Sequence, residues 1–319
     1  MPKPVGSNIT KEGRQKNRWL QRFFCDSIGR LNLAGESINI GGEEKKIESR
    51  QTGSELGMVL TRPFAVIGRA AMNWVDNLGA SAIFLLLAFL KIFRSKQLIK
   101  IVQQIYYIGA RSTMIIMLVS FFTGMVLGLQ SYHALVKFGA QGALGTLVAL
   151  TLVRELGPVL TAIMIAARAG SAITAEIGIQ RISEQIDALD TMRIDPLRYL
   201  ISPRITASII SFPLLTALFD LVGIIGGYVS SVLLLGANAS TYVYRVHASM
   251  DLKDITDGLI KSIVFAVIVS TVCCYQGYFT HMRTDSHGAQ AVGLSTTSAV
   301  VLSCVLILVS DYVVTSLLI

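Results

Sequence analysis

The sequence predicts an all-α membrane protein with several spans. Of its 319 residues, 52% are hydrophobic and only 15% are charged, and the mean hydropathy is +0.59. Soluble domains average about 25% charged residues. The apolar residues also gather in long runs, and a helical span needs about 20 predominantly apolar residues. Because the bilayer core offers no water to backbone amides, these runs are expected to be helical.

The N-terminal third differs from the rest of the chain. Residues 1–50 form a polar, basic tail without the early apolar core of a secretory signal. Residues 51–111 are expected to hold interfacial or elbow helices. Within them, Asn77–Leu90 is apolar but too short for a span, and basic residues from Lys91 onward follow it. This pattern favours a helix lying in the inner interface, with its basic flank at the level of the head groups.

Residues 112–319 contain five apolar runs and are expected to form a five-span domain. The runs are Ser112–Ser131, Phe138–Ala167, Ile205–Tyr244, Ser262–Met282 and Gly288–Ile319. The third run is too long for one ordinary span, so it is expected to hold one long helix plus extracytoplasmic structure. Small residues recur at four-residue spacing, as in Gly124-x-x-x-Gly128 and Gly223-x-x-x-Gly227, which favours close helix packing within a protomer or across a dimer.

The distribution of positive charge predicts the orientation. Of the 28 Lys and Arg residues, 17 lie in residues 1–111, and the segment 168–204 adds five arginines. Short loops rich in Lys and Arg stay cytoplasmic. The N-terminus, the segment 168–204 and the loop at 281–288 are therefore expected inside, and Ile319 outside. The net charge of +8 is interpreted as topology and contact with anionic lipid, not nucleic-acid binding.

The cytoplasmic segment Thr174–Asp195 is predicted to be a short amphipathic helix between two spans. Its isoleucines and Leu189 recur on one helical face, and Pro196 disfavours the helical conformation of the residue before it. The opposite face would carry Glu176, Gln180, Glu184, Asp187 and Thr191. Two interpretations fit this pattern: a linker resting on the membrane surface, or a docking helix for a cytoplasmic partner.

Six motifs in one order carry a family resemblance. They are GMVLGLQ (Gly124–Gln130), RELGPVLTA (Arg154–Ala162), ARAGSAITAEIG (Ala167–Gly178), SEQIDAL (Ser183–Leu189), DPLRYLISPR (Asp195–Arg204) and IKSIVFA (Ile260–Ala266). Together they closely resemble the MlaE family of permeases, the membrane subunits of MCE-type lipid ABC transporters. The resemblance runs from about Ala71 to Ile319 and does not cover residues 1–50.

The resemblance implies a homodimer of permeases, each with an N-terminal interfacial helix and five spans. It implies that a cytoplasmic ABC ATPase, which uses ATP-Mg, docks on the helix between the second and third spans. The implied docking residues are Glu176, Gln180, Arg181, Glu184 and Asp187. It also implies an outer-side MCE-domain protein that exchanges phospholipid with another membrane, and a small STAS-type regulatory subunit. The implied location is a bacterial inner membrane, or alternatively the chloroplast inner envelope.

The sequence contains no G-x-x-x-x-G-K-[ST] phosphate loop, so ATP chemistry is assigned to another polypeptide and no cofactor is expected in this chain. No Ser/His/Asp set or metal cluster stands out either. A lipid-transporting permease is therefore predicted. The alternatives are an intramembrane lipid-modifying enzyme that uses Arg154, Glu155 and Asp311, and a membrane anchor for an MCE protein.

Two adjacent charges, Arg154 and Glu155, interrupt the second apolar run. Neighbouring residues point about 100° apart on a helix, so each charge needs a partner elsewhere, and Lys261 and Asp311 are the available candidates. Pro158 removes a backbone donor nearby and favours a bend. In one interpretation this segment lines a cavity for a lipid head group. In the other, a buried ion network only holds the helices together.

Overall fold

The computed structural model describes residues 79, 84, 98–282 and 288–318. The expected tail at 1–50 and most of the expected interfacial helix at Asn77–Leu90 lie outside these residues. The chain divides into two units, Met1–Phe84 and Leu85–Ile319, and helices α3 to α12 belong to the second.

Five helices of this second unit are long and apolar enough to cross a membrane. They run over Leu98–Lys137, Gln141–Ile182, Leu197–Leu234, Leu252–Tyr278 and Ala289–Leu318. The described residues contain no strand. The predicted all-α class with five spans is therefore confirmed, although the helices extend beyond the apolar runs at several ends.

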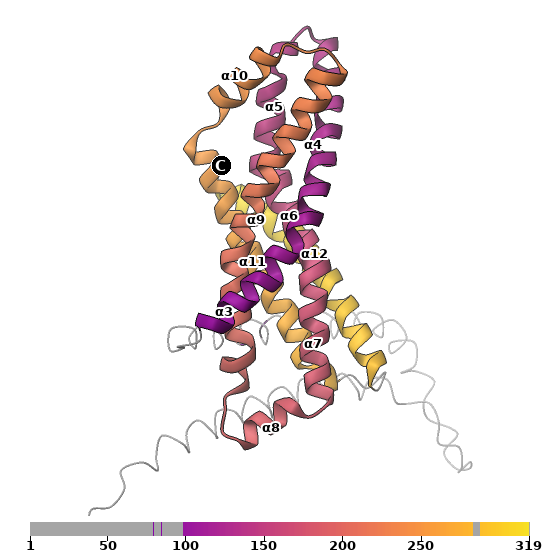
Figure 1. Cartoon of the computed structure of the whole chain (residues 1–319), viewed down its shortest axis with the longest axis vertical. Coiled ribbons are helices and arrows are strands. Elements are labelled where there is room, and N and C mark those ends of the chain that lie inside the picture. The colour runs from indigo at the N-terminus through magenta and orange to yellow at the C-terminus, as the bar shows by residue number, and fades with distance from the viewer. Residues whose placement is uncertain (1–78, 80–83, 85–97, 283–287, 319) are drawn as a thin grey trace, which may run out of the picture. The chain divides into compact units, whose positions relative to one another are not determined.

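The first three spans contain π-helical turns, which interrupt the first two and flank α9 in the third; in such a turn the backbone closes a wider ring than in an α-helix. The first comprises α3 (Leu98–Ile105), η1 (Tyr106–Ala110) and α4 (Arg111–Lys137). The second comprises η2 (Gln141–Ala143, a 3₁₀ turn), α5 (Leu144–Thr151), η3 (Leu152–Leu156), α6 (Gly157–Ile165), η4 (Ala166–Gly170) and α7 (Ser171–Ile182). The third comprises η5 (Leu197–Ile201), α9 (Ser202–Tyr228) and η6 (Val229–Leu234). At η1 the direction changes, and α3 lies at an angle to α4 (Figure 1).

The long third apolar run ends as expected in a separate element. Helix α10 (Ala239–Ser249) begins after Asn238, whose side chain accepts a hydrogen bond from the Thr241 amide, and it packs against α5. The chain then continues through α11 (Leu252–Tyr278), η7 (Thr280–Met282) and α12 (Ala289–Leu318). Helix α8 (Gln185–Thr191) lies at the opposite end of the bundle from the α4–α5 connection (Figure 1).

Small residues bring α4 and α9 into close contact. A side chain at Gly124 would collide with the backbone of Gly223, and one at Gly128 would collide with the Ser230 hydroxyl. The Ser120 hydroxyl donates to the Phe219 carbonyl across the same interface. The four-residue glycine spacing thus serves packing within one chain.

The outer face of α4 is apolar. Met114, Leu118, Phe122 and Val126 recur every fourth residue and are each more than half exposed. Small and polar side chains such as Ser112 are buried on the opposite face. This distribution, with small groups inside and large apolar groups outside, suits a helix that faces lipid.

The prediction of one amphipathic helix over Thr174–Asp195 is wrong. Its first half is α7, which is continuous with the second span and ends at Ile182. Glu184 adopts a left-handed conformation with φ of 57° and separates α7 from the short α8, and Arg193 repeats this conformation at φ 60°. A left-handed residue cannot continue a right-handed helix, so the segment folds into two pieces.

Candidate functional site

Arg154 and Glu155 lie in η3, the π-helical turn in the middle of the second span. At 1.5 Å per residue, Arg154 is about 15 Å from Leu144 and about 21 Å from Arg168, which bracket the apolar part of the span. The two charges therefore interrupt the apolar part of the second span. π-Helical turns inside α-helices occur frequently at functional sites.

Pro158 explains why the Arg154 backbone carbonyl accepts a hydrogen bond from a side chain. In an α-helix the amide of residue 158 would donate to the Arg154 carbonyl, but proline has no amide hydrogen. The Lys261 ammonium on α11 donates to that carbonyl at 2.9 Å. The proline thus leaves an acceptor to which a side chain of another span binds.

Lys261 also joins the second span to the fifth. Its Nζ donates to Glu155 Oε2 at 2.9 Å and lies 3.2 Å from Asp311 Oδ1 on α12. The Lys261 side chain is only 3% exposed. The structure therefore brings together Glu155, Lys261 and Asp311, the candidates that the sequence offered as partners.

Arg154 has a partner that the sequence analysis missed. Its Nε donates to Asp254 Oδ1 at 2.7 Å, and a second guanidinium nitrogen contacts the same oxygen. Asp254 forms a capping box with Asp251 at the start of α11, which holds its carboxylate in place. The Asp-x-x-Asp spacing of Asp251 and Asp254 is a visible signal in the sequence for the start of a helix.

These five side chains, Arg154, Glu155, Asp254, Lys261 and Asp311, are called the ionic layer below. Its members differ in exposure: the Lys261 and Asp254 side chains are 3% exposed, whereas those of Arg154 and Glu155 are 54% and 43% exposed. Charged groups at the depth of a membrane normally face a bundle interior or a wet cavity. The layer is therefore anchored inside the bundle at Lys261 and Asp254, and Arg154 and Glu155 are its exposed members.

The five predicted docking residues lie at the α8 end but do not share one face. Glu176 pairs with the buried Arg204 at 2.9 Å, and Arg181 pairs with Asp187 at 2.7 Å. Glu184 is exposed at the turn between α7 and α8, and Gln180 is partly buried. The expected continuous acidic face is therefore divided between two helices.

His281 on η7 joins this end of the bundle to α7. Arg181 Nε donates to His281 Nδ1 at 3.0 Å. Partial burial and then the Arg181 charge lower the pKa of His281, while Asp187 acts in the opposite direction. In the part of the chain with described coordinates, no three His, Cys, Asp or Glu side chains are grouped so that they could hold a metal ion.

The fold and the ionic layer define a multi-pass helical membrane protein with paired charges within its spans. Comparison with known proteins gives its family. The family model described as Permease MlaE matches residues 101–317. The chain belongs to this family of permeases.

Curated relatives cover most of the chain. A probable ABC transporter permease protein of Rickettsia typhi is 38% identical over 79% of this chain and 96% of its own length. The intermembrane phospholipid transport system permease protein MlaE of Haemophilus influenzae is 39% identical over 80% of this chain and 96% of its own length. The chloroplastic protein TRIGALACTOSYLDIACYLGLYCEROL 1 of Arabidopsis thaliana is 37% identical over 67% of this chain and 60% of its own length.

Proposed function

We propose that this chain is the membrane subunit of an ABC transporter that moves phospholipid between the inner membrane and an outer-side MCE-domain carrier. The observation that supports this most is the ionic layer, because Arg154 and Glu155 are about half exposed within an apolar span. Exposed charges there need water, a polar ligand or a second protein. A zwitterionic phospholipid head group supplies charges of both signs. The name of the Haemophilus relative supports the same substrate.

The transporter is proposed to be a homodimer. Two copies of the exposed side of the ionic layer would enclose a polar cavity shielded from the lipid chains. Within it, Arg154 is proposed to bind the lipid phosphate, while Asp254 holds the guanidinium in place. Lys261 positions Glu155 and ties it to the fifth span. Movement of α11 or α12 would then change the polar lining of the cavity.

Energy is proposed to come from a separate cytoplasmic ATPase that binds ATP-Mg, since this chain has no phosphate loop. The ATPase is proposed to dock at the α8 end, where Glu184 and Asp187 are exposed. Charge reversal at both positions is expected to weaken its association, because each introduced cation would face a groove suited to acids. Association is measured by co-purification and ATPase activity. An intact, fully active complex would exclude this acidic contact.

The location is proposed to be a bacterial inner membrane, with the N-terminus and the α8 end in the cytoplasm. Single cysteines at Ser183 and Ser316, in a chain without native cysteines, test the orientation with a membrane-impermeant thiol reagent added to cells. Labelling is expected at position 316 only. Labelling at 183 but not at 316 would reverse the proposed orientation.

The function is tested by lipid transfer with the purified complex. Arg154→Lys retains a positive charge beside Asp254 but loses the two-pronged guanidinium geometry, so transfer is expected to fall moderately. Glu155→Gln retains a hydrogen-bond acceptor for Lys261, and its complex is expected to purify but transfer lipid poorly. Normal transfer by both variants, in stable complexes, would contradict a lipid-contact role for the layer.

The same purified complex distinguishes a permease from a membrane anchor and from a lipid-modifying enzyme. A membrane anchor for an MCE protein would bind its partner without ATP-dependent lipid transfer. A lipid-modifying enzyme would change the mass of the lipid, whereas a permease releases it unchanged. The lipid is therefore analysed by mass spectrometry after transfer.

A further inference from the structure

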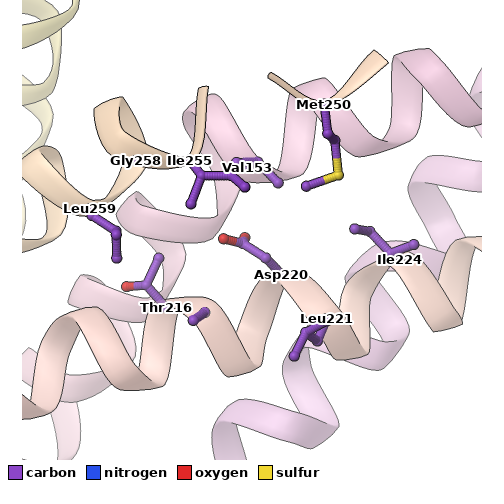
Figure 2. A pocket seen from close by; sticks show the side chains of 10 residues that line it. Val153, Thr216, Asp220, Leu221, Ile224, Met250, Ile255, Gly258 and Leu259 are labelled. Carbon is purple, nitrogen blue, oxygen red and sulfur yellow. The ribbon is translucent and has the colours of Figure 1, made fainter. Parts of the chain in front are cut away.

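A second polar position lies beside η3, in a pocket of about 170 Å³. The pocket lies between α9, η3 and the start of α11, and Figure 2 shows Asp220 extending from α9 into it. Its walls are otherwise mostly apolar: Val153, Ala217, Leu221, Ile224, Met250, Ile255, Gly258 and Leu259. Leu221 is 63% exposed and Ile255 is 39% exposed, so the pocket opens at the side of the bundle.

Two polar side chains of the pocket lack partners. Asp220 Oδ1 and Thr216 Oγ1 are both buried and make no hydrogen bond, and Thr216 is only 2% exposed. A side chain at Gly157 would collide with Asp220 Oδ1, so the missing side chain makes room for this carboxylate. A buried polar group without a partner is costly unless something binds to it.

The neighbouring cations are already engaged. Arg154 pairs with Asp254, and Lys261 pairs with Glu155 and Asp311. Neither cation forms an ion pair with Asp220, whose Oδ1 stays without a hydrogen bond. A ligand with N–H donors would satisfy this oxygen.

We propose that this pocket binds the primary ammonium group of a phospholipid head group, with Asp220 as acceptor and Thr216 beside it. The inference rests on the proposed function and names its substrate class. A pocket of this size holds an aminoethyl group but not a whole lipid, so the acyl chains leave through the side opening. A primary ammonium donates three hydrogen bonds, whereas a trimethylammonium donates none. The pocket therefore selects ethanolamine-type over choline-type head groups.

The test uses the full-length chain in its complex, embedded in nanodiscs with equal amounts of phosphatidylethanolamine and phosphatidylcholine that have identical acyl chains. After transfer to detergent, mass spectrometry counts the retained lipids. The expected ratio is about tenfold in favour of phosphatidylethanolamine, since a hydrogen bond between charged groups contributes that much. Asp220→Asn is expected to bring the ratio close to one. Asp257→Asn, on α11 outside the pocket lining, is the matched control and is expected to keep the preference.

Phosphatidylethanolamine that is methylated once or twice on the head-group nitrogen tests the ammonium site without any change to the protein. Their retention by the unmodified chain is expected to fall stepwise as N–H donors are lost. Equal retention across this series, or an unchanged ratio in Asp220→Asn, would overturn the ammonium site. If phospholipid is retained without head-group preference, only this inference fails. If no phospholipid is retained, the proposed function fails with it.

Free ethanolamine distinguishes a lipid site from a site for a soluble amine. The apolar walls and side opening predict that millimolar ethanolamine does not displace phosphatidylethanolamine. Displacement at low concentration would show that the pocket binds the amine alone, and would overturn the assignment to a lipid.

Discussion

The middle of the bundle and its α8 end both pair basic side chains with carboxylates, but they place those pairs differently. In the middle, Lys261 is 3% exposed and binds two carboxylates and a backbone carbonyl. At the α8 end, Arg204 is equally buried against Glu176, but Arg181 meets an Asp187 side chain that is 57% exposed. Buried pairs are costly to break, whereas exposed pairs contribute little to stability. The difference indicates that Lys261 holds the spans together, whereas the Arg181–Asp187 pair is free to exchange partners.

The largest effect is expected for Lys261→Met. This change removes the buried ammonium that Glu155, Asp311 and the Arg154 carbonyl share, and each lost contact of the charged group costs about 1–3 kcal/mol. The thermal stability of the purified complex, followed by size-exclusion chromatography after heating, should fall strongly. Lys253→Met, at an exposed position on the same helix, is the control and should change little. Equal stability of the two variants would remove the contrast between the regions.

A smaller effect is expected for Glu176→Gln. Glu176 is 44% exposed, but its partner Arg204 is only 3% exposed and would lose its counter-charge. A buried group that loses a partner costs about 1–3 kcal/mol. The same heating assay should place this variant between Lys261→Met and unmodified protein. A loss as large as that of Lys261→Met would mean that the α8 end is as tightly held as the middle.

Asp187→Asn is expected to change stability by about 0–1 kcal/mol, because its ion pair with Arg181 is solvent-exposed on one side. Binding of the ATPase should nevertheless weaken. Chemical denaturation and co-purification are measured on the same preparation. A clear loss of stability with normal ATPase binding would reverse the assignment of this pair.

The smallest expected effect is the dependence of stability on pH through His281. Because the pKa of His281 is lowered in the folded chain, the unfolded chain takes up the proton first as the pH falls below about 6.5. Stability should therefore decline from pH 7.5 toward pH 5.5 and recover as the pH rises. His281→Gln should reduce this decline in a series of melting temperatures. An identical pH profile in the variant would show that other groups cause it.

Much of the fold could be predicted because a bilayer imposes simple rules on apolar runs. The helix bounds were less predictable: the first span begins at Leu98 rather than Ser112, since a helix continues through charged ends that an apolar run excludes. The break at Glu184 has no glycine or proline to signal it. Pro158 signals an irregular turn beside η3, but its π-helical form could not be predicted from the sequence.

The ionic layer was partly predictable for a related reason. A charge inside a span needs a partner, and few residues were available to pair with Arg154 and Glu155, so Lys261 and Asp311 could be named. Asp254 could not be named as a partner of Arg154, because an acidic residue at the start of a helix resembles a charge in a loop until the position of α11 is known. Asp220 has no partner and thus gave no pairing signal.

The central claim is that the ionic layer contacts lipid as well as holding helices. The double variant Arg154→Gln, Asp254→Asn tests it most directly, because it removes both charges together and leaves no buried carboxylate unpaired. Lipid transfer and thermal stability are measured on the same complex. We expect near-normal stability, intact ATPase binding and a roughly tenfold loss of transfer, as for one lost charged contact. Normal transfer by a stable double variant would contradict the claim and leave the layer with a packing role only.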